Sequence, residues 1–137
     1  MTKQDAHYLA QTVSRLERSR VADRDPVADA LKLHSIAGSL HRYAERACSV
    51  EMSEAETQRI ERRVLNLEAK AREIATAYGF RAYFQGDCRG CPLYLIPNDS
   101  IPAFPPYFGP KGGEGSEVDE WVGSHYSSVG HAVPWLG

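Results

Sequence analysis

The change from helix to strand lies in residues 53–84, which read SEAETQRIERRVLNLEAKAREIATAYGFRAYF. Ser53, with Glu56 three positions later, has the spacing of a capping box, in which each side chain bonds an otherwise unpaired backbone N–H. Apolar residues then recur at steps of three and four: Ile60, Val64, Leu67, Ala71, Ile74 and Tyr78. This stripe predicts one long helix, and Gly79 is placed to end it in the left-handed conformation.

After Gly79 the period of the apolar residues changes. Phe80, Ala82 and Phe84 recur at every second position, which is typical of a half-buried strand. The apolar run at 93–96 supplies a second strand, and the glycine-rich segment between the two runs predicts a hairpin.

Upstream of residue 53 the sequence predicts two more helices. Asp25 and Pro26 form an N-cap followed by a proline at the first helical position. A first helix is expected over about residues 4–20, and short connections favour antiparallel packing of all three helices.

The resulting prediction is one α+β domain, in which N-terminal helices, one of them long, pack against a small antiparallel sheet. Its parts are a helical region (1–79), a β-hairpin (80–96), an irregular segment rich in proline and glycine (97–120) and a C-terminal strand (121–137) centred on 131–133. That last strand would be the third of the sheet.

Composition and charge narrow the classes of function. The chain has 137 residues, of which 42% are hydrophobic and 25% charged, and its net charge is −2. There is no apolar run of about 18 residues, and the first residues lack the core of a secretory signal, so we expect a cytoplasmic protein without a membrane partner. Glutamates nearly cancel the arginines and lysines of the long helix, so nucleic acid is not the expected partner.

The predicted hairpin turn, Gly86-Asp87-Cys88-Arg89-Gly90, is the first candidate site. Glycines on both sides permit positive φ, so backbone N–H groups could converge on an anion while Arg89 adds a guanidinium. The alternative is ordinary turn chemistry, in which Asp87 caps the turn and pairs with Arg89.

Cysteines give a second candidate site. Cys88 and Cys91 have the spacing of two zinc ligands, and Cys48 with His41, His125 or His131 could complete a tetrahedron. A second closely spaced ligand pair is absent, so buried or free thiols in a reducing compartment are the alternative. The chain contains residues of the types that serve as nucleophile, base and acid in enzymes, but no local catalytic sequence signature accompanies them. We therefore do not expect an enzyme.

Large aromatic residues are interleaved with the prolines and glycines of the C-terminal third. They are Phe104, Tyr107, Phe108, Trp121 and Trp135. Such residues are unusual in a purely solvated linker, and they predict contact with the protein's own core, a second copy in a homodimer, or a partner protein.

Residues 83–96, YFQGDCRGCPLYLI, resemble a hairpin motif, Y-x-Q-G-D-P-R-G-C-x-L-Y-L, of a family of small uncharacterised proteins of tailed phages and prophages. The resemblance extends upstream to His41, Ala44, Glu45 and Cys48, similar to H-x-x-A-E-x-x-C in that family, and loosely downstream to Tyr126 and residues 130–133. Cys88 stands where the family usually has proline, so the cysteine pair is a feature of this chain.

The resemblance implies a phage accessory protein, and it brings no established reaction with it. The functional prediction is non-enzymatic binding of a host or phage protein, with inhibition of a host defence complex, as in anti-CRISPR proteins, as its specific form. The contact residues would be Asp87, Arg89 and the aromatic residues named above. The competing interpretation is a small-ligand or zinc-binding protein, with or without enzymatic activity, centred on residues 86–91.

Overall fold

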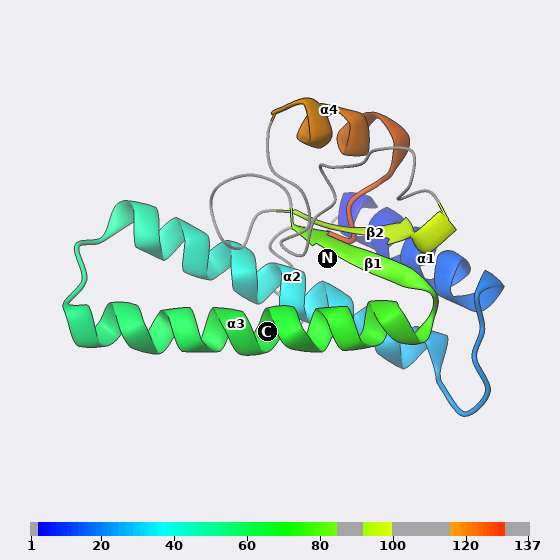
Figure 1. Ribbon diagram of the computed structural model, residues 1–137, viewed down its shortest axis with the longest axis horizontal. Helices are drawn as coiled ribbons and strands as arrows, with labels where there is room; N and C mark the ends of the chain where they lie inside the picture. The colour runs from blue at the N-terminus through cyan, green and yellow to red at the C-terminus, as the bar shows by residue number, and fades with distance from the viewer. Residues whose placement is uncertain (1–2, 85–91, 100–115, 131–137) are drawn as a thin grey trace.

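The computed structural model describes residues 3–84, 92–99 and 116–130, with only the backbone for 116–120. The elements in chain order are helices α1 (Lys3–Arg18), α2 (Pro26–Ser49) and α3 (Glu54–Ala77), strands β1 (Phe80–Phe84) and β2 (Leu93–Pro97), and helix α4 (Ser116–His125). The predicted α+β class is confirmed, because three N-terminal helices pack against a two-stranded antiparallel hairpin. In Figure 1 the hairpin lies between α3 and α4, and the connection of α2 to α3 lies at the far left of the molecule.

The predicted helix starts are observed, with one difference at α3. Asp25 caps α2, and its side chain accepts hydrogen bonds from the backbone N–H groups of Val27 and Ala28 at 3.0 and 3.3 Å. Ser53 caps α3 by accepting from the N–H of Glu56 at 3.2 Å. The Glu56 carboxylate accepts from Arg46 of α2 at 3.1 Å, so the second half of the predicted capping box is replaced by a link between helices.

Gly79 ends α3 as predicted. Its φ is +79°, a conformation that glycine adopts without steric cost, and its N–H donates to the carbonyl of Thr76 at 3.1 Å. β1 begins at the next residue, and the carbonyl of Gly79 accepts from Asn98 just after β2 at 3.1 Å. This one residue therefore turns the chain from the long helix into the sheet.

The hairpin has two buried faces. In the register, Ala82 is opposite Leu95 and Tyr83 is opposite Tyr94. Because side chains alternate along a strand, these two pairs point to opposite sides of the sheet. The Ala82 side joins the main core against the helices, formed around residues such as Leu16, Leu33, Leu40, Val64, Ile74, Phe80 and Leu93. The Tyr83 side packs with Ile96 and with Val122 of α4.

The C-terminal third differs from the prediction. Residues 116–125 form α4, where we expected an irregular segment to 120 and a strand from 121. Val118, Trp121 and Val122 have the i, i+3, i+4 spacing of a helix, which the glycines and prolines upstream obscured. The expected strand at 131–133 lies outside the described residues. Just before it, the N–H of Val129 donates to the carbonyl of Leu93 in β2 at 2.6 Å.

None of the helices in the described ranges is both long and apolar enough to cross a membrane. The longest, α2 and α3, have 24 residues each, but charged side chains recur along both of them.

Candidate functional site

Most of the predicted site residues fall in parts of the chain outside the described residues. Those are Asp87, Cys88, Arg89, Cys91, Phe104, Tyr107, Phe108 and Trp135. The turn, tail and zinc-site hypotheses that depend on them remain predictions. The structure places Trp121, Cys48 and His41.

Trp121 is half-buried on α4 and belongs to a group of ring side chains, which we call the aromatic cluster: Trp121, His125 and Tyr126. The Trp121 ring stacks on that of His125, with centroids 4.6 Å apart, and meets Tyr126 edge to face at 5.8 Å. His125 is exposed, and its Nδ1 lies 2.8 Å from the carbonyl oxygen of Trp121. The cluster is therefore ordered by contacts within the protein while part of it faces solvent.

Arg15 of α1 contacts both the aromatic cluster and strand β2. Its guanidinium donates to the carbonyl of Leu95 at 3.1 Å and lies 6.0 Å from the centroid of the Tyr126 ring. Burial lowers the pKa of Arg15, and the nearby charge of Arg18 adds to this effect. The side chain thus joins α1, the outer edge of β2 and the segment that follows α4.

The zinc hypothesis can be followed only at its α2 residues. Cys48 is exposed near the end of α2, and His41 lies two turns earlier, about 10 Å along the helix axis. His41 Nε2 contacts the Glu45 carboxylate, one turn further along the same helix, at 2.9 Å. Within the described residues no three potential ligands gather, and His125 contacts Trp121 as described above.

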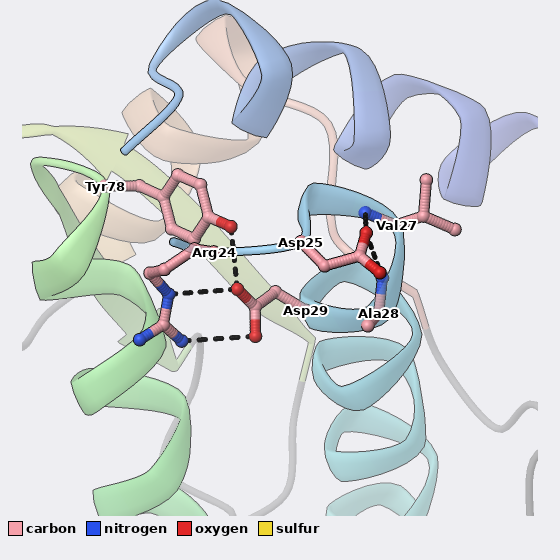
Figure 2. A network of polar contacts seen from close by, with 6 residues as sticks. All are labelled: Arg24, Asp25, Val27, Ala28, Asp29 and Tyr78. Carbon is pink, nitrogen blue, oxygen red and sulfur yellow. Dashed lines mark hydrogen bonds and ion pairs between the residues drawn. The ribbon is translucent and has the colours of Figure 1, made fainter. Parts of the chain in front are cut away.

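A polar network that the sequence did not predict joins the α1–α2 connection, the first turn of α2 and the end of α3. The Asp29 carboxylate accepts two hydrogen bonds from Arg24, at 3.0 and 3.1 Å, and one from the Tyr78 hydroxyl at 2.7 Å. Figure 2 shows Arg24 and Tyr78 converging on Asp29, beside the cap formed by Asp25. Its hydrogen bonds to Asp29 raise the pKa of Arg24, whereas burial, followed by the hydroxyl's own hydrogen bond to Asp29, raises the pKa of Tyr78.

His34 is a second buried polar residue that the sequence analysis missed. Its side chain is fully buried between α1 and α2, and Nε2 lies 3.3 Å from the Thr12 hydroxyl. That hydroxyl donates to the carbonyl of Tyr8, so its oxygen is left as the acceptor toward the His34 ring. Nδ1 has no hydrogen-bond partner among the described residues. Burial lowers the pKa of His34 to about 4.

A signal for both buried groups was present in the sequence. Asp29 and His34 fall among the closely spaced apolar residues of α2, where a polar side chain is expected to be buried and to need a partner.

Comparisons with protein families, with curated proteins and with solved structures find no match for this chain.

Proposed function

We propose that this chain is a non-enzymatic binding protein that acts by contact with another protein. The observation that carries the proposal is the aromatic cluster on α4, where half-buried Trp121 stacks on exposed His125. Tryptophan, tyrosine and arginine supply much of the binding energy at protein interfaces. Tyr126 and Arg15 adjoin the tryptophan here, so the cluster has the composition of an interface centre.

The position of the cluster supports the same role. α4 covers the outer face of the hairpin, anchored by Val122, which is fully buried against Tyr83, Tyr94 and Ile96. A partner that covered Trp121 would meet a ring already held by its neighbours. Binding to a pre-ordered side chain costs less conformational entropy than binding to a mobile one.

The buried polar network points to structure rather than reaction. Asp29, Arg24 and Tyr78 bond to one another, and Arg24 and Tyr78 come from outside α2. Groups engaged in this way hold the α1–α2 connection and α2 against the end of α3. This supports a protein that works through its surface.

The biological setting of the proposal comes from the resemblance of residues 41–96 to small proteins of tailed phages and prophages. An accessory protein of that kind would act in the host cell on a host or phage protein. The specific form that we propose is inhibition of a host defence complex, as anti-CRISPR proteins do.

Affinity capture from a host lysate, with quantitative identification of what co-purifies, tests the contact function. Trp121→Ala should lose the partner that the unchanged protein retains. His125→Ala removes only the exposed ring that stacks on Trp121, and it should weaken capture without affecting the core. Leu65→Ala is the matched control, because it removes an apolar side chain of α3 that is 54% exposed and lies outside the aromatic cluster.

Circular dichroism and thermal melting of each variant separate binding from folding. The proposal predicts a folded Trp121→Ala protein without its partner and normal capture by Leu65→Ala. Full capture by both cluster variants would refute a contact role for the cluster. If Trp121→Ala unfolds, His125→Ala alone provides the test. Unchanged capture of the partner by His125→Ala would then refute a contact role for the cluster.

A further inference from the structure

A groove runs between α2 and α3 and contains two successive hollows. The first has a volume of about 230 Å³, and its lining includes Arg46 and Arg63. The second has a volume of about 460 Å³, and its lining includes Lys32, Leu67 and Lys70. Arg63 and Leu67 lie one turn apart on the same side of α3, so the hollows follow one another along a single α2–α3 groove.

Positive charge is concentrated along this groove. Its lining contains the cations Arg46, Arg59 and Arg63 in the first hollow and Arg24, Lys32 and Lys70 in the second. Among the described residues, the acidic side chains in the lining are Glu56 and Glu73. The whole chain has a net charge of −2, so the groove differs in sign from the protein as a whole.

Half of these cations have an acidic partner within the protein. Glu56 is shared by Arg46 at 3.1 Å and Arg59 at 4.0 Å, and Arg24 belongs to the network of Asp29. The ion pairs of the described residues do not involve the other three, Lys32, Arg63 and Lys70. These three charges come from both walls of the groove.

The groove opens on the side of the helices that faces away from the hairpin. Arg72 of α3 places its guanidinium 5.2 Å from the centroid of the Phe84 ring in β1, so this side of α3 faces the sheet. Lys70 is two positions earlier, which is about 200° around the helix. The groove and the aromatic cluster of α4 therefore belong to different faces of the protein.

We propose that the α2–α3 groove binds an acidic amphipathic helix of a partner protein, an inference that rests on the contact function proposed above. The lining of the second hollow includes Ile36, Leu67 and Ile74, and that of the first includes Tyr43 and Ile60. An amphipathic helix would place its apolar stripe against these residues and its carboxylates against the cations of the two walls.

The length of the groove suits such a helix. From Glu56 to Ile74 the residues that line the groove extend along α3 for about 27 Å, which corresponds to about five turns of a partner helix. Apolar residues at i, i+3, i+4 and i+7 of the partner would face the groove, with Asp or Glu on both flanks. Helices of this length are common recognition elements.

A nucleic acid fits the same groove less well. Phosphate binding needs cations but gains little from the apolar residues that line both hollows. Glu56 and Glu73 would repel a phosphate backbone, and the net charge of −2 opposes attraction to a polyanion at long range. An acidic helix uses the cations and the apolar lining together.

Fluorescence anisotropy with a defined probe tests this inference. The probe is a labelled peptide of about 18 residues, made of Leu at i, i+3, i+4 and i+7 and of Glu at the flanking positions. A scrambled peptide of the same composition, whose leucines share no helix face, is the reference, and a single-stranded oligonucleotide is a second probe. The amphipathic peptide should bind best, and added salt should weaken its binding.

Charge-reversal variants locate the binding site. Arg63→Glu and Lys70→Glu should each weaken peptide binding about tenfold, because an attractive contact becomes a repulsive one. Arg62→Glu is the matched control, since it makes the same charge change at an exposed position outside the groove lining. In ¹⁵N correlation spectra of the full chain, peptide addition should shift the resonances of Ile36 and Leu67.

Equal binding of the two peptides, stronger binding of the oligonucleotide, or equal effects of the three variants would overturn the inference. The outcome is independent of the capture experiment. If Trp121→Ala abolishes capture while the peptide fails to bind the unchanged protein, the contact function stands and the groove inference falls. If the peptide binds the groove but Trp121→Ala and His125→Ala capture the partner normally, the groove inference stands and the contact role of the aromatic cluster falls.

Discussion

Acidification should weaken this fold through His34, the fully buried histidine of α2. In the unfolded chain its imidazole has the ordinary pKa of 6.5, whereas burial lowers the pKa to about 4 in the folded protein. Between these values the unfolded chain takes up a proton that the folded protein does not. The stability present above pH 6.5 is therefore lost progressively as the pH falls toward 4.

The size of the effect follows from the two pKa values. Between pH 7.5 and pH 5, proton linkage at this one histidine lowers the free energy of unfolding by about 2 kcal/mol. That is a large part of the roughly 5–15 kcal/mol by which a typical domain is stable. Most carboxylates stay ionised in this range, so the histidine contribution stands out.

Urea denaturation at about pH 7.5, 6.5, 5.5 and 5 measures the effect. His34→Gln keeps a polar side chain near the Thr12 hydroxyl but cannot take up the proton, so its stability should change much less over this range. His41→Gln, at a partly exposed position of the same helix, should keep the full decrease. A His34→Gln protein that loses as much stability as the unchanged protein would refute the assignment.

Two further variants test the junctions of the fold. Tyr78→Phe removes the hydroxyl that donates to Asp29, and leaving that carboxylate short of one donor should cost about 1–2 kcal/mol in urea denaturation, with little change in the circular dichroism spectrum. Gly79→Ala should lower the free energy of unfolding by about 1–2 kcal/mol. The loss would come from the φ of +79° alone, because an added Cβ meets no atom within 4 Å. Gly79→Asn should lower it less, and equal stability of the unchanged protein and the two variants would contradict this account.

The helices and the hairpin could be predicted because their signals are local. The apolar stripe of α3, the caps at Asp25 and Ser53 and the change of period at Gly79 each lie within a few residues of the element that they define. α4 was not predicted because its ten residues follow a long segment rich in glycine and proline, and a helix of fewer than three turns shows little periodicity.

The polar groups of the interior could not be predicted with their partners, because those partners are distant in sequence. Asp29 meets Tyr78 across 49 positions, and His34 meets Thr12 across 22. The spacing of apolar residues indicates that such a side chain is buried, but not which residue from another helix will satisfy it.

The α2–α3 groove could not be predicted either, because its cations come from two helices that are separate in the sequence. Along α3 alone, glutamates nearly cancel the arginines and lysines, and Arg72 pairs with Glu68 at 3.5 Å, so the sequence of this helix shows no excess of positive charge. In three dimensions Arg63 and Lys70 share a groove with Lys32 of α2, while Glu68 lies on the other side of the helix.

The outer edge of β2 also bears on how the protein behaves when it is concentrated. A two-stranded sheet with an open edge invites a strand from a neighbouring molecule, which is a common start of aggregation. Here the carbonyls of Leu93 and Leu95 already accept from Val129 and Arg15. These two bonds occupy backbone carbonyls that a strand from another molecule would need. They therefore oppose pairing of a second hairpin with the outer edge of β2.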